Sequence, residues 1–188
     1  ENIASNIQAA FVQIGPGKRC YYPLAEAQRA VFSAGRKGNG PLRPGDELLV
    51  QVSRDAMKGK LPALTANLNF SGKYLVLTTG NKKIGFSNKL TKEESTLLNK
   101  WLEEERNLSE REYGLIVRTN AADASKEDFL YELELLKKQY QKVAVNGRNR
   151  TCFSLLYEAE AFYLAAVRDI YTRDLEEIVT DIPEIHSR

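Results

Sequence analysis

The sequence predicts an α+β fold in which a small β-barrel is followed by a compact α/β module and a C-terminal helix. Short strand-forming runs broken by turn residues fill residues 1–66, a pattern typical of a small barrel. Strand and helix patterns alternate across residues 67–157, and an amphipathic helical pattern follows across residues 158–188. We therefore expect three successive parts with these boundaries.

The barrel prediction depends on alternating strand and turn signals. Residues that suit a pleated surface dominate Phe11–Ile14 and Glu47–Ser53. Gly15-Pro16-Gly17 is a strong turn signal, and Arg36–Pro41 is a basic, glycine-rich loop. Barrels of the OB type are built from such short strands, and they bind nucleic acids on one face.

The α/β module is predicted from two strands that alternate with two helices. The strands are Tyr74–Leu77 and Gly114–Arg118. Thr91 opens the first helix with capping-box spacing, and its buried stripe is Leu97, Leu98, Trp101 and Leu102. Ser125 opens the second helix, whose apolar side carries Phe129, Leu130, Leu133, Leu136 and Tyr140.

A loop is expected to separate this module from the last helix. Asn146-Gly147 is a turn signal within Ala144–Phe153. The last helix is predicted from about Glu158 to Leu175. Its apolar residues are Phe162, Leu164, Ala165, Val167, Ile170 and Tyr171.

Composition narrows the class of protein. The 188 residues are 43% hydrophobic and 28% charged, and no apolar run approaches the ~20 residues that span a bilayer. Glu1-Asn2-Ile3 has no signal-peptide pattern, and Cys20 and Cys152 are too few for a disulfide framework, so a cytoplasmic location is the simplest expectation. The single histidine, His186, argues against a Ser-His or Cys-His nucleophile and against a His-rich metal site.

The net charge of +2 hides a strong asymmetry along the chain. Residues 1–90 hold 13 of the 27 lysines and arginines but 5 of the 25 acidic residues, whereas residues 91–188 hold 14 basic and 20 acidic residues. A basic N-terminal part favours a polyanionic partner. The alternative is that its lysines merely solvate a small barrel.

Arg118 and Thr119 follow the apolar strand that begins at Gly114. The strand holds both side chains at a rigid end. The guanidinium offers a planar fork of donors that fits a phosphate, and the hydroxyl adds one more donor. The pair is therefore a candidate phosphate site. The alternative is a core strand that ends on a solvated arginine.

Two aromatic residues, Phe11 and Tyr21, lie on candidate barrel strands. Exposed rings on such a face stack on unpaired bases, and buried rings would instead form the barrel core.

Acidic runs at Glu103–Glu105 and Asp174–Glu177 are typical of solvated helix faces rather than of Mg²⁺ ligands. We predict no catalytic residue and no metal ligand in this chain.

Six stretches in a fixed order carry a resemblance to a known family. They are Ala9–Val12, Tyr21–Leu24, Leu42–Val52, Lys60–Thr65, Ser71–Leu77 and Gly114–Thr119. In this order they resemble the N-terminal half of the ribonuclease E and G family, bacterial endoribonucleases that process and degrade RNA. The resemblance extends through Val167-Arg168-Asp169 to Glu177–Asp181 and so covers nearly the whole chain.

The resemblance implies two binding sites. The residues that match Phe11, Tyr21 and Lys60 contact RNA in the family. The α/β module is a sensor of the 5′-monophosphate end of RNA, in which Arg118 and Thr119 match the phosphate-gripping pair and the main chain at Gly72 and Val76 helps to define the pocket. A glycine at position 72 fits this role because a backbone N–H can then approach a phosphate closely.

One position departs from the family pattern within this sensor. Ser87-Asn88-Lys89 stands where ribonuclease E has Ser-Arg-Arg, so an amide replaces the first arginine. An amide cannot supply that charge, and Lys89 is a point charge without a bidentate fork. We expect weaker discrimination of phosphate for this reason.

The resemblance also implies a larger parent enzyme. The barrel would be an incomplete OB fold whose first strand lies mostly before Glu1, and residues 158–188 would be the returning piece of a ribonuclease-H-like subdomain. The catalytic Asp-Ile-Asn motif, which is absent here, would lie beyond this chain. The parent is expected to be a homo-oligomer that uses Mg²⁺ to hydrolyse single-stranded RNA. The alternatives are a free-standing regulatory module that binds single-stranded RNA, and an assembly piece that contacts partner subunits.

Overall fold

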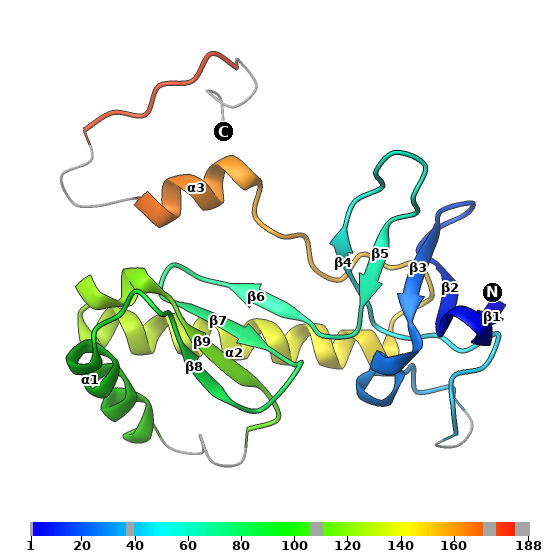
Figure 1. Cartoon of the computed structure of the whole chain (residues 1–188), viewed down its shortest axis with the longest axis horizontal. Helices are drawn as coiled ribbons and strands as arrows, with labels where there is room; N and C mark the ends of the chain where they lie inside the picture. Colours follow the sequence, from blue (N-terminus) through cyan, green and yellow to red (C-terminus); the bar gives the residue numbers. More distant parts are fainter. Residues whose placement is uncertain (1, 37–39, 106–110, 171–175, 183–188) are drawn as a thin grey trace. The chain divides into compact units, whose positions relative to one another are not determined.

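The computed structural model describes residues 2–36, 40–105, 111–170 and 176–182. The chain divides into two compact units, Glu1–Glu158 and Ala159–Arg188. The first unit contains two β-sheets and two long helices, so the chain has the mixed α+β architecture predicted from the sequence (Figure 1).

The first sheet has five strands in the order β1-β2-β3-β5-β4. Neighbouring strands are antiparallel except β3 and β5, which are parallel. The described strands do not close into a barrel, and β1 and β4 form the two edges. The strands are β1 (Asn2–Ala4), β2 (Ala9–Gln13), β3 (Arg19–Pro23), β4 (Gln51–Arg54) and β5 (Ala63–Thr65); short 3₁₀ turns, η1 (Ser5–Ile7) and η2 (Leu24–Arg29), follow β1 and β3.

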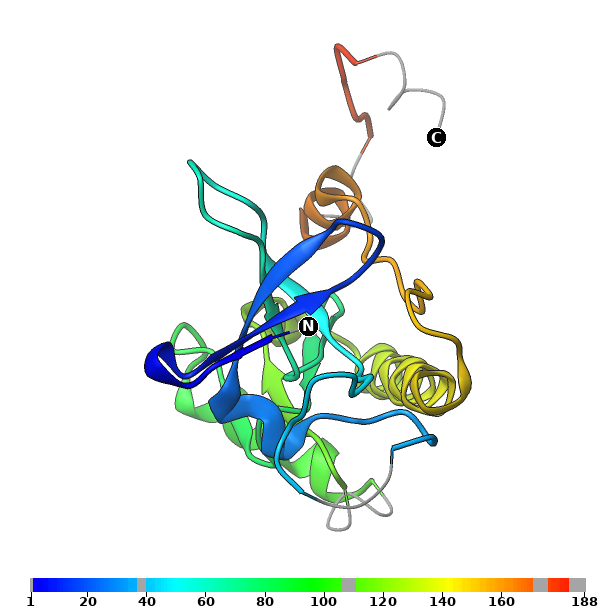
Figure 2. The same cartoon turned by 90° about the vertical axis from the view of Figure 1, so that its right-hand side faces the viewer.

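The predicted turn at Gly15-Pro16-Gly17 joins β2 to β3 as a hairpin (Figure 2). Gly17 has a φ of 70°, which favours glycine because a side chain would be strained there. The strand expected at Glu47–Ser53 is regular only from Gln51, while Leu48 forms an isolated bridge with Phe32. The core of this sheet is small and consists of Ala10, Cys20, Tyr22, Leu64 and Ala66.

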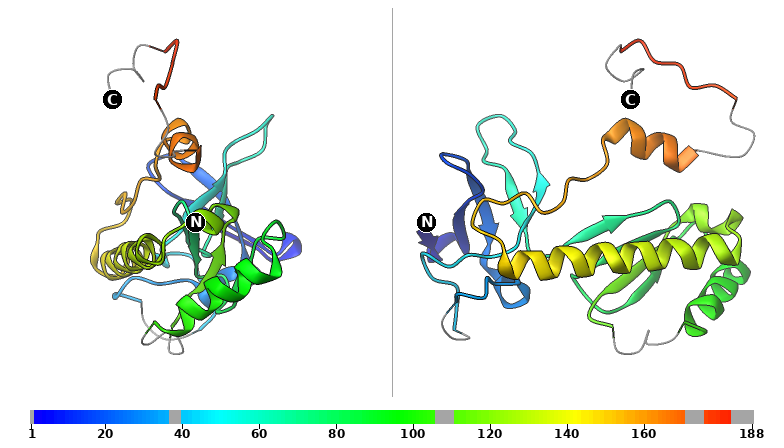
Figure 3. Two further views of the ribbon diagram at one scale, coloured as in Figure 1. Left: turned by 90° about the vertical axis from the view of Figure 1, so that its left-hand side faces the viewer. Right: turned by 180° about the vertical axis from the view of Figure 1, so that it is seen from behind.

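The second sheet has four strands in the order β6-β7-β9-β8. Helices α1 and α2 bury one face of it, and α2 crosses behind the sheet in the view of Figure 1 and in front of it in the reverse view of Figure 3. The elements are β6 (Asn69–Ser71), β7 (Leu75–Thr78), β8 (Ile84–Phe86), α1 (Lys92–Glu103), β9 (Gly114–Val117), the 3₁₀ turn η4 (Thr119–Asp123) and α2 (Lys126–Asn149).

The helix starts agree with the sequence prediction. Thr91 and Glu94 exchange both bonds of a capping box, and the Ser125 hydroxyl caps α2 by accepting from the Asp128 N–H. Leu98 and Leu102 are buried as predicted, but the prediction for Leu97 was wrong, since it is 50% exposed. The reason is geometric: Leu98 and Leu102, four residues apart, already fill the contact with the sheet.

The loop predicted from Ala144 was also wrong in its first part, because α2 continues to Asn149. Tertiary packing overrides the turn signal of Asn146-Gly147. Val143 is buried, and the Ala34 N–H donates to the Arg148 carbonyl at 2.9 Å. A Cβ on Gly147 would lie 2.9 Å from the Leu49 side chain, so this end of the helix packs tightly against the segment that precedes β4.

In the second unit, the predicted last helix is α3 (Phe162–Ile170), shorter at its start than expected. Arg168 pairs with Glu160 at 2.8 Å and with Asp169 at 3.1 Å in this unit. Tyr171, Asp174 and His186 lie outside the described residues. No helix in the described ranges is long and apolar enough to cross a membrane.

Candidate nucleic-acid interface

Phe11 and Tyr21 lie directly opposite each other on β2 and β3. Because side chains alternate along a strand, both rings point away from the face on which Ala10, Cys20 and Tyr22 form the core. Both are half-buried, unlike the fully buried Tyr22. The pairing therefore places two aromatic rings side by side on the face of the first sheet opposite its core.

Arg19 adds a cation to this face. Its guanidinium carbon lies 4.2 Å from the centre of the Phe11 ring, which is a cation–π contact. We call Phe11, Arg19 and Tyr21 the aromatic face. It combines rings that suit base stacking with a charge that suits a phosphate.

Lys60 is exposed in the hairpin between β4 and β5, where it bridges to Met57. Tyr21 on β3 pairs with Ala63 at the start of the parallel strand β5. Because β3 and β5 are parallel, their first residues lie at the same end of the sheet, and so do the loop before β5 and the turn before β3. Lys60 thus lies toward the Arg19 end of the aromatic face, and both hairpins extend upward in Figure 1.

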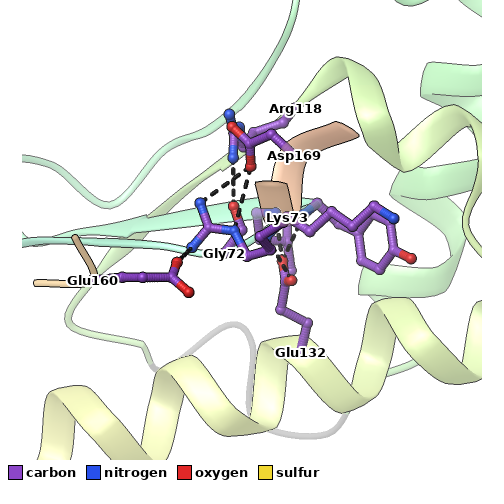
Figure 4. A network of polar contacts seen from close by, with 9 residues as sticks. Gly72, Lys73, Arg118, Glu132, Glu160 and Asp169 are labelled. Carbon is purple, nitrogen blue, oxygen red and sulfur yellow. Dashed lines mark hydrogen bonds and ion pairs between the residues drawn. The ribbon is translucent and has the colours of Figure 1, made fainter. Parts of the chain in front are cut away.

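Arg118 stands at the end of β9, where its N–H donates to the Tyr74 carbonyl at 2.8 Å. Its guanidinium Nη1 donates to the Gly72 carbonyl at 2.6 Å, as Figure 4 shows. The strand ladder fixes the main chain of Arg118, and the carbonyl fixes the far end of its side chain. The guanidinium is therefore held in one orientation.

Thr119, the residue after Arg118, takes part in a hydroxyl pair. Its Oγ1 lies 2.9 Å from Ser87 Oγ, and the Ser87 N–H donates to the Val117 carbonyl at 2.9 Å. The contact of Gly72 with Arg118 and that of Ser87 with Thr119 involve successive residues at the end of β9, and we call these four residues the Arg118 cluster. Two hydroxyls that share one hydrogen bond keep a second O–H hydrogen, and an anion accepts such a donor.

The remaining predicted residues lie close by in the fold. Asn88 and Lys89 follow Ser87 directly and are exposed. Val76 is half-buried on β7 and pairs with Ile116, two residues before Arg118 and on the same face of β9. The structure thus brings Gly72 and Arg118 into direct contact and places Thr119 and Val76 in the same region of the second sheet.

The comparisons with known proteins agree with the resemblance read from the sequence. The model of the ribonuclease E/G family matches residues 69–188. This chain belongs to the ribonuclease E/G family. The match includes the whole Arg118 cluster.

Individual relatives are similar to this chain over nearly its whole length. Ribonuclease E of Escherichia coli (strain K12) is 30% identical over 97% of this chain and 18% of its own length. Ribonuclease E of Buchnera aphidicola subsp. Acyrthosiphon pisum is 29% identical over 97% of this chain and 21% of its own length. Ribonuclease E of Synechocystis sp. is 29% identical over 97% of this chain and 27% of its own length. The chain therefore spans about a fifth to a quarter of the length of these relatives.

One residue of this region, Glu132, was not identified from the sequence. Its Oε2 accepts the Lys73 N–H at 2.7 Å, and its Oε1 accepts the N–H groups of Tyr74 and Leu75 at 2.8 Å each. The signal was present, because Glu132 lies on the side of α2 that carries the buried Phe129 and Leu133. An acidic residue on the apolar face of a helix requires a partner.

Charge accumulates around this turn. The Lys73 ammonium lies 5.5 Å from the centre of the Tyr74 ring. Burial, followed by the nearby carboxylates of Asp128, Glu132 and Asp123, raises the pKa of Tyr74 above its ordinary value. In the described ranges, no three His, Cys, Asp or Glu side chains gather as a metal-binding group.

Proposed function

We propose that this chain is the RNA-binding and 5′-monophosphate-sensing portion of a ribonuclease E/G-type endoribonuclease. The observation that carries the proposal is the Arg118 cluster, in which the Gly72 carbonyl holds the Arg118 guanidinium and the next residue, Thr119, pairs its hydroxyl with that of Ser87. Membership of the family gives this arrangement its proposed ligand. The relatives named ribonuclease E supply the proposed activity of the parent enzyme.

In this proposal the 5′-monophosphate binds Arg118 and Thr119, with the main chain at Gly72 and Val76 defining the pocket. A guanidinium already held by the Gly72 carbonyl loses less side-chain freedom when it grips a phosphate. Asn88 contributes no charge here. We therefore propose a modest preference for a 5′-monophosphate over a 5′-hydroxyl end, about tenfold, or ~1.4 kcal/mol.

The first sheet supplies general affinity for single-stranded RNA in this proposal. Phe11 and Tyr21 stack on bases, and Arg19 and Lys60 contact phosphates. In this proposal the first sheet corresponds to the RNA-binding sheet of an OB-type fold. Catalysis, Mg²⁺ and the homo-oligomeric assembly belong to the parent enzyme, and no described residue is assigned to the chemical step.

Binding of a fluorescent, unstructured single-stranded RNA tests the role of the first sheet. We expect weak binding that falls steeply with salt, because phosphate contacts release counterions. Phe11→Ala and Tyr21→Ala should each weaken it by about 1–3 kcal/mol if the rings stack on bases. The matched control is Tyr131→Ala, which removes a ring that is 66% exposed on α2. Equal effects of all three substitutions would contradict the assignment of the aromatic face.

The sensor role is tested with two oligonucleotides that differ in a 5′-monophosphate or a 5′-hydroxyl. We expect the full chain to prefer the monophosphate, and Arg118→Gln to remove that preference. Arg150→Gln removes an exposed arginine beyond α2 and should leave the preference unchanged. Equal affinity of the unmodified chain for the two ends would overturn the sensor proposal.

A further inference from the structure

The turn between β6 and β7 is not closed in the usual way. In an ordinary two-residue hairpin, the residues that flank the turn exchange two N–H···O bonds. Here the Gly72 N–H donates to the Leu75 carbonyl at 2.8 Å, but the Leu75 N–H donates to Glu132. The Gly72 carbonyl instead accepts from Arg118. The side chain of Glu132 has replaced one main-chain bond of the turn.

Glu132 engages three successive N–H groups with one carboxylate. Lys73, Tyr74 and Leu75 all donate to it at 2.7–2.8 Å, and Figure 4 shows the carboxylate reaching up from α2 beneath the turn. Consecutive main-chain N–H groups that converge on one anion form a rigid cradle. Bonds to an ionised acceptor are about twice as strong as neutral ones. The turn is therefore anchored to the helix at three points.

Gly72 completes this contact from the other side. A Cβ on Gly72 would lie 2.3 Å from both the carboxyl carbon and Oε1 of Glu132, a distance that real Cβ atoms do not show. A residue with a side chain at this position would displace either the carboxylate or the turn. Glycine at position 72 and glutamate at position 132 thus fit each other, although they lie on different elements.

We propose that Glu132 is a positioning residue of the 5′-phosphate sensor, because it takes the Leu75 N–H and so leaves the Gly72 carbonyl directed at Arg118. This inference rests on the proposed function. Glu132 does not bind the phosphate. It sets the turn whose carbonyl orients the guanidinium that does.

Glu132→Gln tests the inference, since the amide keeps the shape of the side chain but offers one acceptor oxygen and one N–H₂ donor. A donor then faces a main-chain donor, so the turn loses at least one bond. The preference is the ratio of the affinities for the 5′-monophosphate and 5′-hydroxyl oligonucleotides. We expect this ratio to fall from about tenfold in the unmodified chain to twofold or less in the variant. Affinity for the 5′-hydroxyl oligonucleotide should be unchanged.

The sign of this effect separates positioning from simple electrostatics. Removing a negative charge near an anion site should strengthen phosphate binding if charge alone matters. The inference expects the opposite. Glu127→Gln is the matched control, because it makes the same charge change at an exposed position in the first turn of α2. A preference in Glu132→Gln that equals or exceeds that of the unmodified chain would overturn the inference.

A double-substitution cycle distinguishes an action through Arg118 from a general loosening of the fold. In an Arg118→Gln background, Glu132→Gln should cause no further loss of preference.

If Glu132→Gln does not fold, Gly72→Ala disturbs the same contact without altering the helix. A lost preference in Gly72→Ala would support the inference, and a kept preference would overturn it. Failure of both variants to fold would assign the contact to the fold alone and also overturn it. A folded, unmodified chain without any preference would instead overturn the proposed function itself.

Discussion

In the first sheet, the rings of Phe11 and Tyr21 are half-buried on the face opposite the core, whereas Phe70 of β6 and Phe129 of α2 are fully buried in the core between the second sheet and its helices. The core of the first sheet holds five buried residues, two of them alanine, and that of the second holds fourteen. Trp101 packs edge-on against Phe129 with ring centres 5.7 Å apart. A thin sheet with aromatic rings on one face suits an adaptable surface, and a thick, helix-backed sheet suits a pocket of fixed geometry.

The polar contacts divide in the same way. The Arg118 cluster and Glu132 lie where a strand end, a tight turn and a helix meet in the second sheet. The aromatic face of the first sheet depends on strand pairing and one cation–π contact. The comparison teaches that the two sheets of one unit differ in build, and the proposed function assigns general affinity to the first and end discrimination to the second.

The largest expected effect comes from removing a ring from the thick core. Phe129→Ala should lower the free energy of unfolding by about 3–5 kcal/mol, because Phe129 is fully buried and its loss leaves a cavity. Phe11→Ala should cost less than about 1 kcal/mol, since its ring is already half-exposed. Urea unfolding followed by circular dichroism measures both. Similar losses in the two variants would break the comparison between the sheets.

A smaller effect is expected from a pair of glycines on neighbouring strands of the second sheet. A Cβ on Gly114 would lie 2.6 Å from the Asn81 carbonyl oxygen and 2.7 Å from that of Lys83, whereas a Cβ on Gly85 would meet nothing within 4 Å. Gly114→Ala should therefore cost about 1–3 kcal/mol, because main-chain atoms must move. Gly85→Ala should change stability by less than about 0.5 kcal/mol. Thermal unfolding distinguishes them, and equal costs would show that the packing at Gly114 is looser than described.

The smallest effect on stability concerns the hydroxyl of Tyr22 in the first sheet, which is buried without a hydrogen-bond partner in the part of the chain described. Tyr22→Phe should raise the free energy of unfolding by about 1 kcal/mol at pH 7, because an unsatisfied buried hydroxyl is costly. A loss of more than about 1 kcal/mol would mean that the hydroxyl has a partner. Urea unfolding at pH 7 provides the measurement.

The same residue predicts a dependence on alkaline pH. Burial first, and the Glu26 carboxylate second, raise the pKa of Tyr22 above its ordinary value of 10.0. The folded-state pKa exceeds the unfolded one, so this contribution to stability is complete below pH 10 and is lost as the pH rises toward the folded-state pKa. Each such group lowers the free energy of unfolding by about 1.4 kcal/mol per pH unit in that window. Tyr22→Phe should show a shallower decline above pH 10 than the unmodified chain.

Local patterns predicted local structure well. The capping box of α1, the Ser125 cap of α2 and the buried faces of both helices follow from residues three and four apart, so Thr91, Leu98 and Phe129 were found in their predicted roles. Gly114 was correctly placed at the start of a strand. Gly147 was predicted to lie in a loop but lies in α2. Its packing against Leu49 joins segments that are far apart in the sequence, so local patterns could not predict it.

The candidate site could be predicted only as a set of residue types. The resemblance named Gly72 and Arg118, but their contact spans 46 positions and that of Glu132 with Tyr74 spans 58. Neither spacing follows a helical or strand period. The pairing of Phe11 with Tyr21 likewise needed the register of β2 and β3, which the turn between them determines.

The central claim is that the first sheet provides general RNA affinity and the second provides discrimination of the 5′ end. The most direct test measures the affinity of the unmodified chain, Tyr21→Ala and Arg118→Gln for one RNA sequence with a 5′-monophosphate and with a 5′-hydroxyl. We expect Tyr21→Ala to weaken both affinities equally and keep their ratio, and Arg118→Gln to abolish the ratio while leaving the 5′-hydroxyl affinity unchanged. A changed ratio in Tyr21→Ala, or an equal loss for both ends in Arg118→Gln, would contradict this division.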